Sequence, residues 1–210
     1  MVQTKPARDL SLEDLKERFG LQVTLQPDFF AEWSDLPTPS ADEQERLSRV
    51  QQNYMNLSVR QNFSEEAVKM VVLSPLLDLA AFYQAPFAIQ TEESVELLSE
   101  DEGYIVRGKI DVLLVRQRLW ILVIESKSTQ FDVLTALPQA LTYMLSAPNR
   151  EQPVYGLLVN GREFVFVKLV HKPALTCIRS FALSVEREHE LAQVLSALKI
   201  IRQRILDIRE

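Results

Sequence analysis

The stretch from Trp120 to Lys127 constrains the fold of this chain most. It reads Trp-Ile-Leu-Val-Ile-Glu-Ser-Lys, so four consecutive aliphatic residues lead directly into a glutamate and a lysine. An apolar run without alternation is typical of a strand buried on both faces, at the centre of a sheet covered by helices. Charged groups are costly to bury unless they are paired. The sequence therefore predicts a central strand of an α/β domain, with Glu125 and Lys127 placed together at its end.

Four further segments are predicted to be strands, which makes about five in total. They comprise residues 87–98, 104–115, 154–159 and 163–170. An acidic turn ending at Gly103 separates the first two, and Asn160-Gly161, a strong hairpin signal, joins the last two. The predicted fold class is α/β, with a mixed central sheet of about five strands flanked by helices.

Four segments carry helical patterns. A serine or aspartate caps a helix over residues 40–57, and Ser64 caps another that runs to about residue 83 with an interruption at Pro75. A third helix passes through residues 139–145. The last is an amphipathic helix over residues 191–208, with apolar side chains along one stripe.

Length and composition indicate one domain with a sizeable core, because the chain has 210 residues, of which 47% are hydrophobic and 25% charged. Residues 1–60 are expected to form a helical extension packed on the core, and residues 61–210 the main domain. The longest apolar run is too short to cross a bilayer, and the N-terminus lacks the apolar core of a signal peptide. We therefore expect no membrane association and a cytoplasmic location.

The polar composition limits the chemistry that is open to the chain. One cysteine, Cys177, and two histidines are too few ligands for a Cys/His zinc site, so any metal must be held mainly by oxygen. A net charge of -6 counts against strong nonspecific binding to nucleic acid, since that binding depends on Lys and Arg neutralising phosphates. Residues 104–130 are nevertheless locally basic.

The two strands that flank position 118 are predicted to form an antiparallel hairpin with a loop of about three residues, 117–119. Pairing Val115 with Ile121 then sets Asp111 directly opposite Glu125. Opposed side chains in such a ladder have Cβ atoms roughly 4.5–5.5 Å apart, at which distance two carboxylates repel each other. A bound cation would offset that repulsion.

Magnesium is the cation that this arrangement favours, because two carboxylates with open positions for water and phosphate oxygens are a usual way to hold it. Lys127 lies two residues beyond Glu125 and projects from the same face of the strand, whereas Ser126 is expected to point to the other face. A metal that activates water and a lysine that stabilises the developing charge suffice in outline for phosphodiester hydrolysis.

These residues also resemble a known family. Gly108-Lys-Ile-Asp111, followed after thirteen residues by Glu125-Ser-Lys127, is similar to the D…ExK signature of the PD-(D/E)XK nuclease superfamily, although Ile110 stands where that signature has proline. Gln139-Ala-Leu-Thr-Tyr143 resembles the QxxxY motif of RecB-type nucleases and of the N-terminal nuclease domain of type I restriction R subunits. The resemblance spans about residues 64–170 and implies a restriction-endonuclease-like fold.

The resemblance also implies roles for individual residues. Asp111, Glu125 and Lys127 would form the catalytic cluster, with Lys127 acting on the attacking water, and Gln139 and Tyr143 would lie near the DNA backbone. The implied metal ligands are Asp111, Glu125, the backbone carbonyl of Ser126 and Glu66, with Glu65 as the less favoured alternative to Glu66. The implied cofactor is Mg²⁺, for which Mn²⁺ can substitute. The implied partners are DNA and either a second copy of the chain or separate motor and specificity subunits.

The sequence thus favours Mg²⁺-dependent phosphodiester hydrolysis of DNA and leaves alternatives open. The first is a catalytically inactive nuclease-fold module that binds nucleic acid or a partner protein, which the acidic net charge favours. The second is a phosphodiesterase acting on RNA or a small molecule. Gln139 and Tyr143, four residues apart on one helix face, could instead hydrogen-bond to each other or to backbone. Glu65 and Glu66 could serve only to start their helix.

Overall fold

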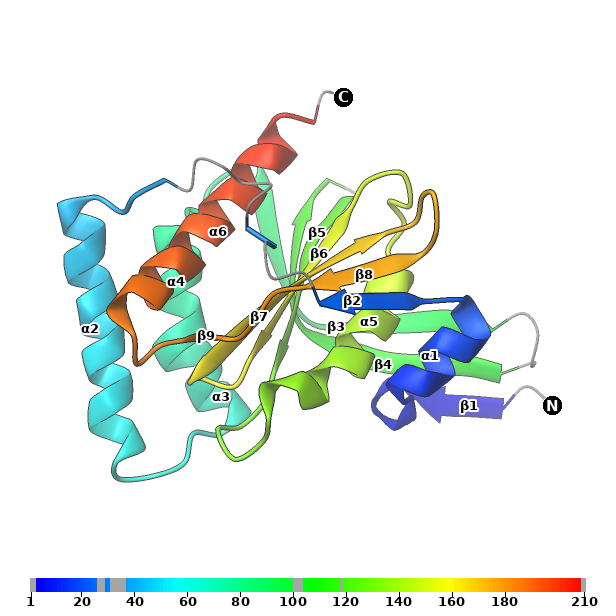
Figure 1. Ribbon diagram of the computed structural model, residues 1–210, viewed down its shortest axis with the longest axis horizontal. Helices are drawn as coiled ribbons and strands as arrows, with labels where there is room; N and C mark the ends of the chain where they lie inside the picture. Colours follow the sequence, from blue (N-terminus) through cyan, green and yellow to red (C-terminus); the bar gives the residue numbers. More distant parts are fainter. Residues whose placement is uncertain (1–2, 26–28, 31–36, 100–103, 118, 209–210) are drawn as a thin grey trace.

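The structure, a computed structural model, describes residues 3–25, 29–30, 37–99, 104–117 and 119–208. Its elements form three layers, in which helices cover both faces of a central sheet (Figure 1). One face is covered by helices α2 (Ala41–Ser58), α3 (Glu65–Val68), α4 (Ser74–Leu79) and α6 (Glu188–Leu206). Helices α1 (Leu12–Phe19) and α5 (Leu137–Leu145) cover the other face. The α/β class predicted from the sequence is confirmed.

The sheet is larger than the sequence predicted, because its described part has nine strands instead of about five. They are β1 (Gln3–Pro6), β2 (Gln22–Leu25), β3 (Phe87–Ser99), β4 (Tyr104–Arg116), β5 (Leu119–Ser126), β6 (Val154–Val159), β7 (Glu163–Val170), β8 (Thr176–Arg179) and β9 (Leu183–Ser184). Strands β3 to β7 are the five that were predicted. The additional strands have four residues or fewer, so they carry too little periodicity to be recognised.

The sheet is mixed, as predicted. Its order is β1-β4-β5-β6-β7-β8-β2, with β3 also pairing with β4 and β9 with β7. The pairs β1·β4, β5·β6 and β2·β8 are parallel, and the others are antiparallel. The acidic turn at residues 100–103 lies outside the described residues.

Alternating side chains of β4 supply two separate hydrophobic cores. Val112 and Leu114 pack into the core beneath α2, α4 and α6, whereas Leu113 and Val115 pack into the core beneath α5. Strand β5 is buried on both faces in the same way. Leu122 and Ile124 pack into the first core, and Val123 packs into the second. The unbroken apolar run therefore lies at the centre of the molecule, as predicted.

The first sixty residues are not purely helical. Strand β1 pairs with the start of β4, and β2 pairs with β8. Ser40 caps α2 with a reciprocal hydrogen-bond pair to Glu43, and α2 packs against α6, where Gln44 donates a hydrogen bond of 2.7 Å to Glu188. This part of the chain therefore contributes to both the sheet and its helical cover, and a domain boundary at residue 60 stays a prediction.

The predicted helix over residues 64–83 is divided and ends early. Ser64 caps α3, which passes into a π-turn at Lys69–Leu73 before α4 begins. Pro75 lies in the first turn of α4, directly after the π-turn, so the interruption expected at this proline coincides with the change of helix type. The helix ends at Leu79 because Ala81 adopts a left-handed φ of 59°.

The hairpin between β4 and β5 has a shorter loop than predicted. Val115 pairs with Trp120, not Ile121, because the register shifts by one residue between Leu114 and Val115. Strand β4 ends at Arg116 and β5 begins at Leu119, and Gln117 has a positive φ of 54°.

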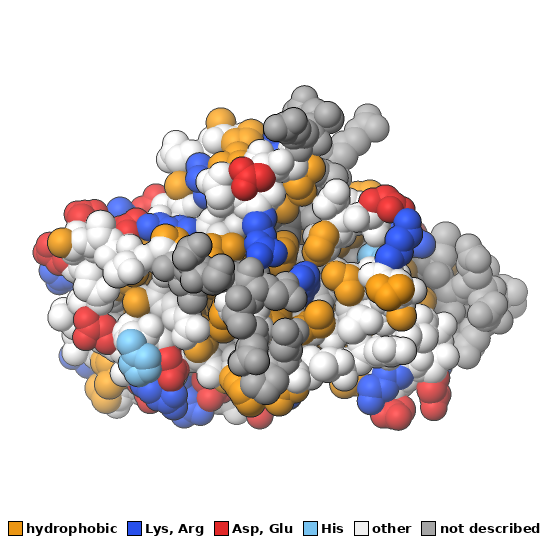
Figure 2. Space-filling model, turned by 45° about the horizontal axis from the view of Figure 1, so that its top comes forward, with side chains coloured by type: hydrophobic (Ala, Val, Ile, Leu, Met, Phe, Trp, Pro, Cys, Tyr) orange, Lys and Arg blue, Asp and Glu red, His pale blue; other side chains and the backbone are white. Residues whose placement is uncertain are grey.

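The surface carries both acidic and basic side chains (Figure 2). On the face that Figure 2 shows, acidic and basic side chains lie interspersed. No helix within the described residues combines the length and apolarity needed to span a membrane.

Candidate active site

The site lies where β4 changes its neighbour. Residues 104–107 of β4 pair with β1, whereas residues 112–116 pair with β5, so Asp111 follows the point where the two neighbours diverge. The carboxyl end of β5, at Ser126, reaches the same place, and so does the end of β6, which runs parallel to β5. In open α/β sheets, ligands bind where strand order changes, beyond the carboxyl ends of the strands. The topology therefore places Asp111 at a position suited to ligand binding.

Asp111 is held by donors on two sides. Its Oδ2 accepts hydrogen bonds from the backbone N–H and the Oγ of Ser126, both at 2.7 Å, and its Oδ1 lies 3.2 Å from the Nζ of Lys69. Ser126 was expected to point to the other face of β5 from Glu125 and Lys127, and its hydroxyl contacts Asp111, whereas Lys127 contacts Gln139 of α5. Ser126 is still paired with Val159 of β6, so the alternation of side chains along β5 continues to the end of the strand.

Glu125 is the buried carboxyl group of the site. Val112 pairs with Ile124, and continuing the same register brings Asp111 level with Glu125. The Glu125 side chain is 1% exposed, its Oε1 accepts a hydrogen bond of 3.0 Å from Lys127, and its buried Oε2 has no partner among the described residues. Burial raises the pKa of Glu125 to about 8, the charge of Asp111 adds to the rise, and Lys127 opposes it.

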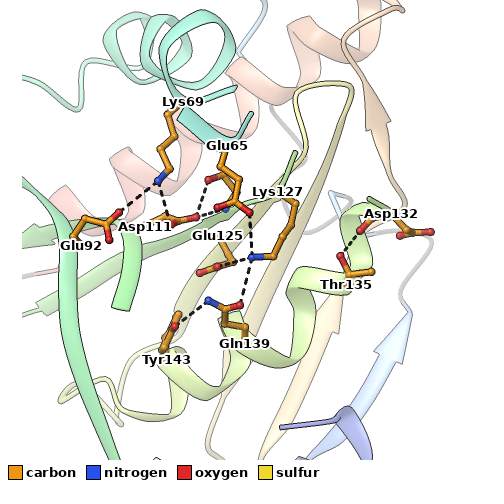
Figure 3. A network of polar contacts seen from close by, with 11 residues as sticks. Glu65, Lys69, Glu92, Asp111, Glu125, Lys127, Asp132, Thr135, Gln139 and Tyr143 are labelled. Atoms are coloured by element: carbon orange, nitrogen blue, oxygen red, sulfur yellow. Dashed lines mark hydrogen bonds and ion pairs between the residues drawn. The ribbon is translucent and has the colours of Figure 1, made fainter. Parts of the chain in front are cut away.

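Lys127 links Glu125 to α5 (Figure 3). Its Nζ lies 3.4 Å from Oε1 of Gln139 and 3.9 Å from Oε1 of Glu65. Gln139 in turn donates a hydrogen bond of 3.0 Å to the hydroxyl of Tyr143, one helical turn away. Burial and the charge of Glu125 raise the pKa of Tyr143 to about 12, so its hydroxyl stays protonated.

The predicted metal ligand Glu66 is placed differently from the other predicted residues. Glu66 is exposed, and its own backbone N–H and then Ser64 lower the pKa of its carboxyl group, with Lys69 adding to the effect. Among the described contacts, it makes no hydrogen bond or ion pair with the predicted catalytic residues. Glu65, its neighbour, faces Lys127 (Figure 3).

Two further charged residues belong to the cluster and were not predicted. Lys69, the first residue of the π-turn, lies 3.6 Å from Oε1 of Glu92 as well as contacting Asp111. Thr91 pairs with Val112 in β4, and the same register brings Glu92 level with Asp111. Pairing the predicted strands 87–98 and 104–115 in the right register would have placed Glu92 beside Asp111. Lys69 carries no sequence signal beyond its place one turn after Glu65.

The backbone at Glu92 is strained. Its φ of 54° lies in the left-handed region, which costs a residue with a side chain about 1–3 kcal/mol. The surrounding ladder holds this conformation, because the residues on both sides of Glu92 pair with β4. Such strain, like π-turns, is frequent near functional sites.

The two carboxyl groups would suit a magnesium ion that keeps several water ligands, and not a metal ion held by protein ligands alone. Within the described residues, no group of three or more His, Cys, Asp and Glu side chains is arranged to hold a metal. Magnesium keeps several waters and takes only one or two carboxylates, which matches Asp111 and Glu125. The unpartnered Oε2 of Glu125 is an acceptor that a cation would satisfy. Cys177 is buried, and burial raises its pKa to about 12, which suits a structural role.

Comparison with known proteins adds little to this geometry. No protein-family model and no curated protein matches the chain. Among solved structures, the chain is similar to a fragment described as an HsdR subunit of a type I restriction enzyme from Vibrio vulnificus YJ016, with 18% identity and a TM-score of 0.41. The match covers 66% of this chain and 26% of the Vibrio vulnificus chain, so it spans about a quarter of the length of that protein. A similarity at this level carries no argument about activity.

Proposed function

We propose that this chain is a nuclease domain that hydrolyses phosphodiester bonds of DNA with the aid of Mg²⁺. One observation carries the proposal: the buried carboxyl group of Glu125 has one oxygen, Oε2, without a partner among the described residues, while its other oxygen, Oε1, lies 3.0 Å from the Nζ of Lys127. An unpaired buried carboxylate is costly unless a cation or a proton accompanies it. The resemblance of the D…ExK and QxxxY patterns to the PD-(D/E)XK superfamily supports the same function.

Asp111 and Glu125 are the proposed ligands of the metal ion. When bound, Mg²⁺ supplies positive charge that stabilises the negative charge growing on the phosphate and makes water a stronger nucleophile near neutral pH. Ser126 orients Asp111 through two hydrogen bonds, so one of its carboxylate oxygens keeps a fixed direction. Glu66 is not required as a ligand in this proposal.

Lys127 is the proposed group that acts on the attacking water and the phosphate oxygens. Its side chain is 18% exposed, so it is largely shielded from bulk water yet reachable by substrate. Gln139 accepts from Lys127 and donates to Tyr143, so this short chain of hydrogen bonds orients the ammonium toward Glu125. An oriented cation of this kind stabilises a developing oxyanion without reorganisation during the reaction.

The proposal is tested by cleavage assays on linear duplex, circular duplex and single-stranded DNA and on RNA, with Mg²⁺, Mn²⁺ or a chelator. Lys127→Met is expected to lower the rate by about 100-fold or more. Lys172→Met is the matched control, because Lys172 is exposed, pairs with Glu151 and lies at the opposite end of the strands from the site. Metal-dependent cleavage of DNA that Lys127→Met loses and Lys172→Met keeps supports the proposal, and its absence on all DNA substrates refutes it.

The second candidate is a module that binds nucleic acid or a partner protein without cutting. The net charge of -6 and the occupation of both Asp111 oxygens by Ser126 and Lys69 favour it. Binding measured on the same DNA and RNA molecules separates the two candidates, since the module would bind without metal-dependent cleavage. Partner subunits, a homodimer and a cytoplasmic location stay predictions.

A further inference from the structure

Lys69 occupies a position that the proposed chemistry does not explain. It contacts Asp111 at 3.2 Å and Glu92 at 3.6 Å, so a single ammonium group bridges carboxylates from two adjacent strands. Burial alone would lower the pKa of Lys69, but Asp111 and then Glu92 outweigh that effect and raise it. The π-turn that starts at Lys69 sets the direction of this side chain toward the sheet. Lys69 is therefore a fixed positive charge at Asp111.

We propose that Lys69 is an internal counter-cation of Asp111 that a divalent ion must displace in order to bind there. The inference rests on the proposed function and deepens it. Ser126 already engages Oδ2 of Asp111, so Oδ1, which Lys69 contacts, is the oxygen that remains for a metal. A divalent cation and an ammonium repel each other at such distances. Lys69 thus sets the metal affinity of the site from within the protein.

The structure gives Lys69 room to leave Asp111. Its side chain lines a cavity of about 410 Å³ beside the site, together with Met70, Ser74, Tyr83 and Thr91. The aliphatic stem can stay against the apolar wall of this cavity while the ammonium moves to its polar edge, as long lysine side chains commonly do. Glu92 is 60% exposed and can follow the ammonium as its partner. Displacement therefore requires rotamer changes and no movement of the backbone.

The contrasting explanation is that Lys69, Asp111 and Glu92 form a purely structural ionic cluster. In that case Lys69 would brace the π-turn against the sheet, and its removal would lower stability without changing metal affinity. The two explanations differ in a quantity that can be measured directly. That quantity is the dissociation constant of the divalent ion, measured without substrate.

The experiment measures binding of Mn²⁺ and Mg²⁺ to the full chain by calorimetry and, for Mn²⁺, by electron paramagnetic resonance. Lys69→Met is expected to bind the ion about fivefold to tenfold more tightly than the wild type, because the ion no longer breaks a part-buried ion pair. Lys69→Arg keeps the charge and is expected to stay within about twofold of the wild type. Lys172→Met, an equal loss of charge far from the site, should leave the constant unchanged.

The outcomes separate this inference from the proposed function. If the wild type binds no divalent ion, both fail. If it binds one that Asp111→Asn abolishes, and Lys69→Met binds no more tightly, only the role of Lys69 is refuted. Thermal unfolding of each variant establishes that it is folded at the temperature of the titration.

A second measurement on the wild type needs no variant. Lys69 should react faster with an amine-directed reagent when Mn²⁺ or Mg²⁺ is present, because its ammonium is then released from Asp111. Mass spectrometry of the modified peptides reports Lys69 and, as the internal standard, the exposed Lys172. A reactivity of Lys69 that is unchanged at saturating metal would overturn the proposed displacement.

Discussion

Replacing Glu125 by glutamine should stabilise the protein at pH 8 in the presence of a chelator. Glu125 is 1% exposed and its pKa is raised from 4.5 to about 8, mainly by burial. Glutamine has nearly the same shape and carries no charge. Its amide oxygen can still accept the hydrogen bond from Lys127, which lies 3.0 Å from Oε1 in the wild type. The substitution therefore removes the cost of a buried anion while preserving the packing around it.

The sign and size follow from proton linkage. Because the pKa of Glu125 is higher in the folded state than in the unfolded state, the folded state binds more protons between pH 4.5 and about 8. The free energy of unfolding of the wild type therefore falls as the pH rises through this range. At about 1.36 kcal/mol for each pH unit the total is at most roughly 5 kcal/mol. Coupling of Glu125 to Asp111 and Lys127 reduces the expected difference to about 2–4 kcal/mol.

Thermal and urea unfolding of both proteins from pH 5 to pH 8.5, with chelator, measures the effect. At pH 8 Glu125→Gln should melt about 4–16 °C above the wild type, with the gap closing toward pH 5. Comparing the variant with the wild type cancels the contributions of other groups that titrate in this range. Glu151→Gln, which removes an exposed carboxylate that pairs with Lys172, should show no such gap. A gap that stays constant with pH, or a variant less stable at pH 8, would refute the reasoning about burial.

Two further predictions concern the neighbourhood of Tyr143. Tyr143→Phe removes the acceptor of the Gln139 hydrogen bond, so Lys127 loses part of its orientation. We expect kcat of the proposed cleavage to fall about fivefold to tenfold with KM nearly unchanged. A rise in KM of the same size with kcat unchanged would contradict a positioning role. Gly108→Ala places a Cβ 2.5 Å from the Tyr143 hydroxyl and 2.8 Å from Cβ of Ala7, so urea denaturation should show a loss of about 1–3 kcal/mol. An unchanged midpoint for Gly108→Ala would show that the strand and α5 can move apart freely.

The parts of the fold that were predicted correctly are those whose signal is local. Strand β5 follows from an unbroken aliphatic run, and the β6–β7 hairpin follows from Asn160-Gly161 between two apolar segments. Ser40 and Ser64 both cap helices, as the sequence predicts. In each case the residues that decide the structure lie within a few positions of one another.

The parts that were missed depend on partners far away in the sequence. Strand β2 has four residues, and its partner β8 lies about 150 residues later, so neither shows why it should be extended. The same holds for Lys69, whose role depends on carboxylates from β3 and β4 meeting beside the π-turn. Asp111 and Glu125 were found because one hairpin joins them, and that pairing could be worked out from a local register.

The charge balance of the site ties its stability to its proposed activity. Four carboxylates and two ammonium groups form the cluster: Glu65, Glu92, Asp111, Glu125, Lys69 and Lys127. Four formal negative charges against two positive ones leave two in excess, which one divalent ion would neutralise. With a pKa of about 8, Glu125 carries a proton at neutral pH and removes half of that excess. If the proposed divalent ion binds here, it would have to expel a proton from Glu125 as well as displace Lys69, and both costs would lower its affinity. Under the proposed function, the burial that makes Glu125 a poor anion in the absence of metal would also favour a cation whose charge is high enough to overcome both costs.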